Sequence, residues 1–213
     1  MAYHRPTEIP NEDELVGQFE RGIRGLVRRF RNHPYAFYTA SDMHCYLYHR
    51  LYKGGVFNGL YRTSEEHDTI LLHKEFPTNS RYRRNEDKIL ATDPTGRRRG
   101  AFDISIWNPR TIGDFKHREQ SVLCAAELAL NECGSSSVHT VNDSIKLADE
   151  ANDIAHGYLL FFVRDDTRRY EKNEATIWKA LNEAAESVRV VFARVDGEEK
   201  PKPKYLGDWQ TKR

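Results

Sequence analysis

The sequence is poor in cysteine and in long hydrophobic runs. Its three cysteines stand at positions 45, 124 and 133 of 213 residues, and so sparse and odd a count argues against a disulfide framework and fits a reducing cytosol. The longest strongly apolar run, Tyr158–Val163, is far shorter than the ~20 residues of a membrane-spanning helix. The first residues also lack the apolar stretch of a signal peptide. We therefore expect a cytoplasmic protein that is neither secreted nor embedded in a membrane.

Several motifs that would point to common chemistries are also missing. No repeat of solenoid length is visible. Neither a glycine-rich nucleotide loop nor a Gly-x-Ser-x-Gly elbow occurs, so nucleotide-cofactor and serine-hydrolase chemistry lack support. Cys124, Cys133 and His139 do not have zinc-finger spacing. Charge of one sign is not in excess either, since 33 Lys and Arg face 32 Asp and Glu, so local clusters matter more than the total.

Hydrophobic periodicity predicts an α/β domain. A first helix is capped by Asn11 and ends before Pro34, and a second is expected to start at Ser41 and to stop at Gly54. Further segments follow, with strands over 69–76, 101–107, 122–130, 158–163 and 188–195 and helices over 138–155 and 171–185. This order predicts a mixed sheet of about five strands flanked by helices. We expect a single domain over residues 1–196, with a helical N-terminal extension over about 1–35, and a Pro- and Lys-containing tail over 197–213.

Two carboxylates on strands are the strongest chemical signal. Strict alternation places Phe102, Ile104 and Ile106 on one face of a strand and Asp103 on the other. Glu127 lies inside an apolar run, where a charge is costly unless it is paired or holds a cation. One interpretation is an ion pair between Glu127 and an arginine at the sheet end. The other is that Asp103 and Glu127 bind Mg²⁺ through oxygen ligands, which would lower the pKa of a bound water.

Three segments have the order of a known nuclease core. Arg97-Arg-Arg-Gly-Ala-Phe-Asp103 matches an "R-x-D" strand, Cys124-Ala-Ala-Glu127-Leu-Ala129 matches a "hydrophobic-E-x-K" strand, and Asp143-Ser-Ile-Lys146-Leu147 matches the helix that follows. In this the chain resembles the PD-(D/E)XK nuclease superfamily, over residues 40–195. The resemblance implies a restriction-endonuclease-like fold and Mg²⁺- or Mn²⁺-dependent cleavage of nucleic acid, with DNA as the expected substrate.

The resemblance also assigns roles to residues. Asp103 and Glu127 would hold the metal, joined by the main-chain carbonyl of Leu128. The position of the motif's lysine is Ala129, so Lys146 from the following helix would take the lysine's catalytic place, although a solvated helix lysine is the ordinary interpretation of Lys146. Other accessory residues would be Asn131 on the same strand face, and Asp42 and Glu75 upstream, which are equally explained by a helix dipole and by a surface ion pair.

Basic residues cluster between the first two core strands. They are Arg81, Arg83, Arg84, Arg97, Arg98 and Arg99. We expect them to hold a phosphate backbone, which gives affinity without sequence information, while a charged, solvated hairpin is the alternative. If the lysine function is lost, the chain would instead be a catalytically inactive nuclease-fold protein that acts as a nucleic-acid-binding or protein-interaction subunit. The sequence leaves open a homodimer or a larger complex with other subunits.

Overall fold

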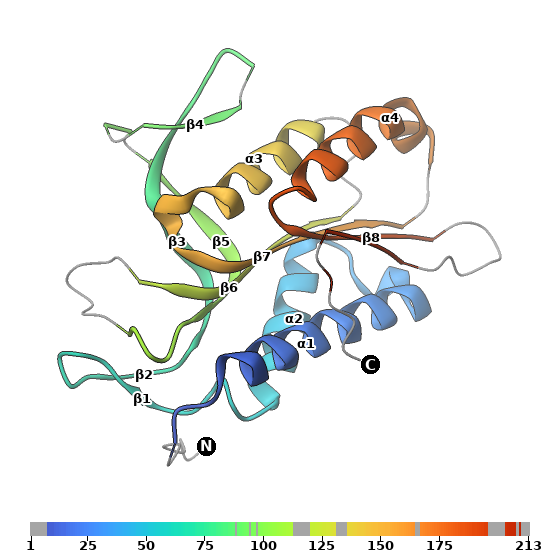
Figure 1. Cartoon of the computed structure of the whole chain (residues 1–213). Coiled ribbons are helices and arrows are strands. Elements are labelled where there is room, and N and C mark those ends of the chain that lie inside the picture. Colours follow the sequence, from blue (N-terminus) through green and yellow to red (C-terminus); the bar gives the residue numbers. More distant parts are fainter. Residues whose placement is uncertain are drawn as a thin grey trace.

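Helices lie on both faces of one large sheet (Figure 1). A computed structural model describes residues 8–87, 89–93, 95–96, 98–112, 120–130, 136–164, 167–195, 203–207 and 209. The helices are α1 (Glu12–Asn32), α2 (Ala40–Lys53), α3 (Ser136–Ala148) and α4 (Thr167–Ala184), with short 3₁₀ turns at Pro34–Ala36 and Glu150–Asn152. The strands are β1 (Tyr61–Arg62), β2 (Asp68–Thr69), β3 (Leu72–Arg84), β4 (Leu90–Thr92), β5 (Arg98–Trp107), β6 (Val122–Leu130), β7 (Ile154–Val163), β8 (Arg189–Arg194) and β9 (Lys204–Leu206).

The large sheet is mixed, as the sequence predicted. Its strand order is β4-β3-β5-β6-β7-β8-β9. β6, β7 and β8 run parallel, and every other neighbouring pair is antiparallel. The prediction of about five strands was too low, because the edge strands β4 and β9 have three residues each and so are too short to show a hydrophobic period. β1 and β2 form a separate hairpin.

Alternating side chains of the central strands pack into two hydrophobic cores, one on each face of the sheet. Leu128, Leu160 and Phe162 pack with α1 and α2, whereas Ala129 and Phe161 pack with α3 and α4. This two-sided burial explains why every residue of β6 is buried and all but Glu127 are apolar, since a strand covered on both faces has no solvent side. The functional groups therefore have to lie where the strands end or separate.

The first helix belongs to the main core rather than forming an extension. Leu15, Phe19 and Phe30 are fully buried, and the ring centroid of Phe30 lies 5.0 Å from that of Phe162 on β7. The described part of the C-terminal segment is docked as well. β9 pairs with β8, and Trp209 Nε1 donates a hydrogen bond to the carbonyl of Val190 at 3.2 Å.

Several predicted boundaries were wrong for identifiable reasons. β3 continues through Pro77 to Arg84, and the register shifts between Pro77 and Arg81, an irregularity of the kind at which proline is tolerated in a strand. Thr39 rather than Ser41 caps α2, because its hydroxyl accepts from the Asp42 N–H. The helix expected to reach Ala155 ends at Ala148, so that β7 begins earlier than predicted.

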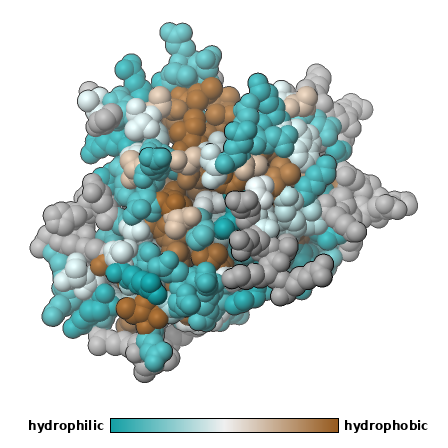
Figure 2. Space-filling view, viewed as in Figure 1, coloured by the Kyte–Doolittle hydropathy of each residue, from teal (hydrophilic) through white to brown (hydrophobic). Residues whose placement is uncertain are grey.

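The described helices include none that is both long and apolar enough to cross a membrane. Figure 2 shows that hydrophilic side chains cover most of the face seen in Figure 1, and that hydrophobic ones gather in the region of α3.

A buried polar cluster fixes the C-terminal end of α3 against β3. The Asn152 side chain, 1% exposed, accepts from the Ser80 N–H at 2.9 Å and donates to the Tyr82 hydroxyl at 2.7 Å and to the Lys146 carbonyl at 2.8 Å. Tyr82 in turn donates to Asp149 at 3.0 Å. Because one amide joins both elements, the position of α3 relative to the sheet depends on it.

Replacing Asn152 by alanine should lower the free energy of unfolding by about 3 kcal/mol, since several buried polar groups lose their partner. Urea denaturation measures the change. Glu150→Ala, at an exposed position of the same turn, is the matched control and should stay within about 0.5 kcal/mol of the wild type. A loss below about 1 kcal/mol for Asn152→Ala would contradict the anchoring role.

Candidate active site

Asp103 lies where β5 loses its pairing with both neighbours. The β5–β6 ladder stops where Ile104 pairs with Ala126, and the β3–β5 ladder passes from the pair at Ile104 to the pair at Phe102, leaving Asp103 unpaired. The Asp103 carboxylate instead accepts a hydrogen bond from the Leu128 N–H at 2.7 Å. The prediction of a single face for Phe102, Ile104 and Ile106 was therefore wrong, because Phe102 packs with α3 and α4 while the two isoleucines pack with α1 and α2.

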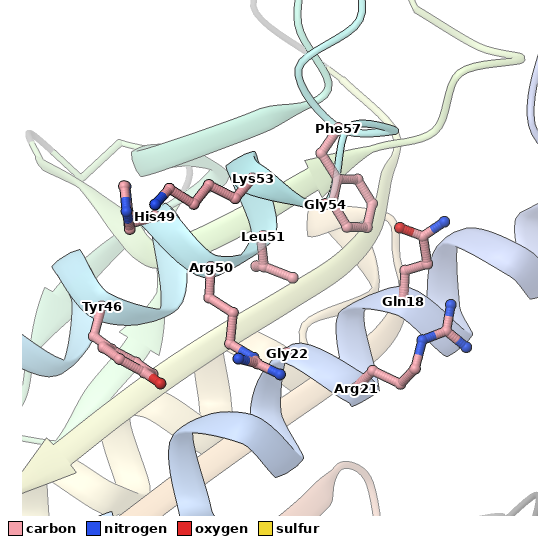
Figure 3. A pocket seen from close by; sticks show the side chains of 10 residues that line it. All are labelled: Gln18, Arg21, Gly22, Tyr46, His49, Arg50, Leu51, Lys53, Gly54 and Phe57. Atoms are coloured by element: carbon pink, nitrogen blue, oxygen red, sulfur yellow. The ribbon is translucent and has the colours of Figure 1, made fainter. Parts of the chain in front are cut away.

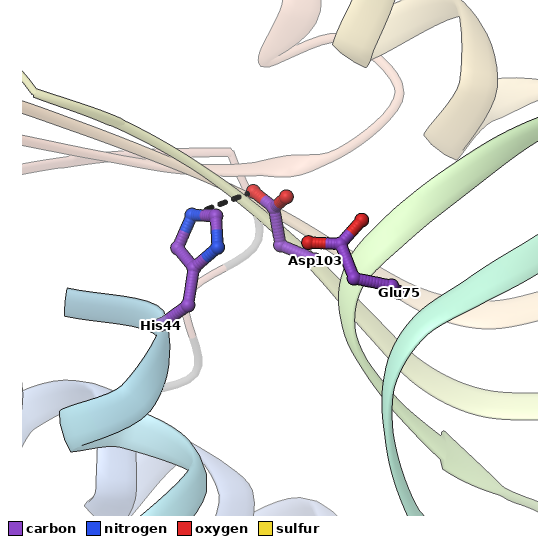
Figure 4. Close-up of side chains that lie close together, drawn as sticks. All are labelled: His44, Glu75 and Asp103. Carbon is purple, nitrogen blue, oxygen red and sulfur yellow. Dashed lines mark ion pairs between the residues drawn. The ribbon is translucent and has the colours of Figure 1, made fainter. Parts of the chain in front are cut away.

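A histidine and a second acid converge on Asp103. His44 Nε2 lies 3.2 Å from Asp103 Oδ2, and the ligand atoms of His44, Glu75 and Asp103 all lie within 4.8 Å of one another (Figure 4). His44 comes from the buried face of α2 and Glu75 from the exposed surface of β3. One imidazole and two carboxylates are a donor set that divalent ions accept, so these three residues could hold a metal.

The backbone of Glu75 is strained in a way that fits a functional position. Its φ is +53°, in the left-handed region, where a residue with a side chain pays about 1–3 kcal/mol and persists only if the surroundings impose it. Such outliers cluster at binding and catalytic sites. In Figure 4 the Glu75 carboxylate lies beside that of Asp103. The strained backbone of Glu75 accompanies this approach of the two carboxylates.

Asp103 is held in its ionised form. Burial by itself would raise the pKa of Asp103, but the neighbouring imidazole of His44, the Leu128 N–H and the charge of Lys146 together bring that pKa below its usual value. A carboxylate that stays ionised is available to bind a cation. The group thus combines a preformed negative charge with two neighbouring ligands.

Glu127 pairs with Lys146. Glu127 is 2% exposed, and Lys146 Nζ lies 2.5 Å from Glu127 Oε1 and 3.0 Å from Asp143 Oδ1. The ammonium also donates to the Ala101 carbonyl at 3.1 Å. Two interpretations from the sequence were therefore wrong. The partner of Glu127 is a lysine and not an arginine, and the Lys146 side chain, which is only 12% exposed, is not a solvated helix lysine.

The three charges shift one another's pKa in different directions. Burial and the nearby Asp143 raise the pKa of Glu127 well above its usual value, and Lys146 offsets this only in part. Burial likewise raises the pKa of Asp143. Burial would lower the pKa of Lys146, but the two carboxylates outweigh it and raise that pKa. Lys146 consequently remains protonated and can act as a cationic donor, not as a base.

Gly100 on β5 makes room for this lysine. A Cβ at that position would lie 2.9 Å from Lys146 Cδ and 3.3 Å from Thr78 Cγ2. Any side chain at residue 100 would thus displace the stem that carries the ammonium to Glu127. The sequence shows a glycine in the strand but not the close approach that requires it.

Several arginines of β3 and β5 line a pocket to which Lys146 also belongs. This pocket of about 840 Å³ lies between β3, β4, β5 and α3, and its lining includes Arg83, Arg84, Arg99 and Lys146 together with the acids Asp93 and Asp143. Arg99 Nη1 is buried without a hydrogen-bond partner among the described residues. Arg81 is used otherwise, since it donates to the Gly96 carbonyl at 3.1 Å. Arg97 and the side chain of Arg98 lie outside the described residues.

The structure brings together some predicted residues and leaves others apart. Asp103, Glu127 and Lys146 share one region of the sheet, in which Leu128 contributes its N–H to Asp103. Asp42 completes the cap of α2 by accepting a hydrogen bond from the Thr39 N–H at 2.7 Å. This agrees with the interpretation of Asp42 as a residue that stabilises the start of the helix. Asn131 lies outside the described residues.

Sequence reasoning missed His44. His49, the nearest histidine on the same helix, follows His44 by five residues, which is not the i, i+4 spacing of a helical metal pair. The available signal for His44 was its place on the buried face of α2 with Leu47 and Leu51, at the i, i+3, i+7 positions. A histidine on an apolar face needs a polar partner, and that partner is Asp103, supplied by a distant strand.

A double substitution should separate the ion pair from its two halves. Lys146→Met leaves Glu127 buried without its cation and should lower the free energy of unfolding by about 3–5 kcal/mol. Adding Glu127→Gln should recover most of this loss, which a double-mutant cycle in urea measures. Lys179→Met, at a 75% exposed α4 lysine that also faces a glutamate, is the control. Additive losses would contradict a direct interaction.

The His44, Glu75 and Asp103 group should bind Mn²⁺ more tightly than Mg²⁺, because an imidazole ligand favours the transition metal. Titration calorimetry with each ion measures this. His44→Gln should weaken Mn²⁺ binding by about tenfold or more, whereas His49→Gln, on the same helix but outside the group, should leave it unchanged. Equal Mn²⁺ affinity for the wild type and Glu75→Gln would contradict the ligand set.

Comparison with known proteins gives no further guide to this site. No family model, no curated protein and no solved structure matches the chain. Its function has to be argued from the geometry of the site, because a fold by itself does not specify one.

Proposed function

We propose that the protein is a metal-dependent phosphodiesterase that hydrolyses nucleic acid, with DNA as its expected substrate, on a restriction-endonuclease-like fold. One observation carries the proposal. The strand position at which the resemblance requires a lysine holds Ala129, yet the ammonium of Lys146 reaches Glu127 at 2.5 Å from the following helix. A lysine supplied from elsewhere in the chain at this place is what a shifted catalytic residue requires.

The arrangement of the strands supports the same interpretation. β3, β5, β6 and β7 are consecutive neighbours in the sheet. Because Ile104 pairs with Ala126, the register places Asp103 opposite Glu127 in the antiparallel pair. The two acids and the lysine thus lie near the point where β5 and β6 separate, and Lys146 also lines the basic pocket beside it.

Each group then has a task in hydrolysis. Asp103, His44 and Glu75 would hold a divalent ion, which supplies Lewis-acid polarisation of a phosphoryl oxygen and a lowered pKa for a bound water. In the reaction the water loses a proton and forms a bond to phosphorus, the bond to the leaving oxygen breaks, and that oxygen takes up a proton. Lys146, kept charged by Glu127 and Asp143, would stabilise the negative charge that develops on the phosphoryl oxygens.

The arginines of the pocket would position the substrate. Arg83, Arg84 and Arg99 line the pocket to which Lys146 also belongs, and a guanidinium fork matches the oxygens of a phosphate. Contacts of this kind hold the backbone without selecting a sequence. Binding through them should therefore weaken as the salt concentration rises.

A second function is favoured by one feature of the same site. Glu127 is engaged in an ion-pair cluster with Lys146 and Asp143, so its carboxylate is not free to bind a metal while the cluster is intact. This cluster is compatible with a nuclease-fold protein that binds nucleic acid without cleaving it. Such a protein would act alone or as a subunit of a complex, and would need no metal at Glu127. That function requires salt-dependent DNA binding that EDTA leaves unchanged.

Cleavage assays separate the two functions. We expect the wild type to cut plasmid, single-stranded DNA or RNA with Mn²⁺ or Mg²⁺, and Asp103→Asn to reduce the rate about 100-fold or more, because the ion loses its central ligand. Glu183→Gln, on the exposed surface of α4, should cut normally. Undiminished cleavage by Asp103→Asn would contradict the assigned site. DNA binding without cleavage by the wild type, with every ion, would favour the second function.

A further inference from the structure

A second basic pocket lies between α1 and α2. It has a volume of about 440 Å³ and is lined by side chains of both helices and of the turn after α2 (Figure 3). Its charged groups are Arg21 from α1 and Arg50 and Lys53 from α2, and His49 also lines it. It shares no lining residue with the pocket to which Lys146 belongs.

The charge in this pocket is not neutralised by the described part of the chain. No acidic residue is among the described residues that line it. Across the described residues, Arg21, Arg50 and Lys53 take part in no ion pair with an acid, in contrast to Arg24 on α1, which faces Glu20 at 3.4 Å. Cations brought together without acids repel one another. An anion in the pocket would relieve that repulsion.

Two glycines of α1 shape the pocket. A Cβ at Gly22 would lie 2.6 Å from Leu51 Cδ2, and a Cβ at Gly25 would lie 2.1 Å from Arg50 Nε. The two helices therefore approach closely, and the Arg50 guanidinium rests against the bare backbone of α1. In Figure 3 it lies between α2 and α1, near Gly22, while the Arg21 guanidinium lies farther along α1, beside Gln18. A guanidinium held in one place loses less freedom when it binds an anion.

We propose that this pocket binds the phosphate of a nucleotide-sized ligand. The planar guanidinium fork of Arg50 matches phosphate oxygens, and Arg21 and Lys53 add positive charge elsewhere in the lining. The volume falls within the range of about 300–1,000 Å³ typical of small-molecule sites. Among the described residues that line it there is a histidine but no acid, and we therefore assign the pocket binding rather than a reaction.

The inference is independent of the proposed nuclease activity. The pocket touches the candidate active site only through α2, which carries His44 nine residues before Lys53, or about 13 Å along the helix axis. Phosphate of this kind occurs both in a free nucleotide and at the end of a nucleic acid strand. The chemistry of recognition is the same for the two sources, and only binding experiments with both can assign one.

Calorimetric titration tests the pocket, with EDTA present so that no divalent ion contributes. The probes are ADP, inorganic pyrophosphate, and one short oligonucleotide with and without a 5′-phosphate. Arg50→Gln should weaken binding of the phosphorylated probe by about tenfold or more. Gly25→Ala keeps every charge but displaces the guanidinium, and should also weaken it severalfold while its helix propensity rises. Asp103→Asn should bind as the wild type does.

Two matched controls guard against effects of net charge and of helix stability. Arg28→Gln removes an exposed arginine of α1 outside the pocket, and Gly17→Ala places a methyl group where the nearest atom is 3.7 Å away. Both should retain wild-type affinity. ADP binding assigns a free nucleotide, and binding only of the 5′-phosphorylated strand assigns a strand end. Failure of every probe to bind, or equal weakening by Arg28→Gln and Arg50→Gln, would overturn the proposal.

Discussion

The buried contact between Lys146 and Glu127 is the interaction on which the rest of the site depends. A carboxylate in the middle of an apolar strand has to find a cation, and α3 supplies one across the face of the sheet. That reach requires the bare backbone of Gly100 beneath the lysine stem. It also requires the hydrogen bonds of Asn152, which hold the end of α3 and the Lys146 carbonyl in place. Loss of either would leave charge stranded in the core.

The two central acids have opposite electrostatic environments. Asp103, beside a histidine and an N–H donor, has a lowered pKa, whereas burial and a neighbouring acid raise the pKa of Glu127. Carboxylates whose pKa values are pushed apart typically have different tasks in one site. Asp103 is suited to hold a cation. Glu127 is suited to hold Lys146, and so contributes to the chemistry through another residue.

This arrangement lowers stability locally, through strained backbone and through charges that are unpaired among the described residues. Glu75 has a left-handed backbone conformation, and Asp103 of β5 is paired neither with β3 nor with β6. At the α1–α2 contact, cations gather around a pocket without acids among the residues described there. Local costs of this kind are expected where a protein binds something, since stability alone would favour relaxed backbone and neutralised charge.

Local patterns in the sequence determined much of the frame. β6 has the predicted bounds, Asn11 caps the first helix, and Asp103 and Glu127 stand out because each breaks an apolar strand. Periodicity could assign such residues to elements because it depends only on near neighbours. Only the tertiary structure decided that Lys146 is the partner of Glu127, that His44 and Glu75 join Asp103, and that Arg50 meets Gly25. These contacts join segments far apart in the chain, and a one-dimensional pattern specifies which face a side chain occupies but not which distant group lies opposite it.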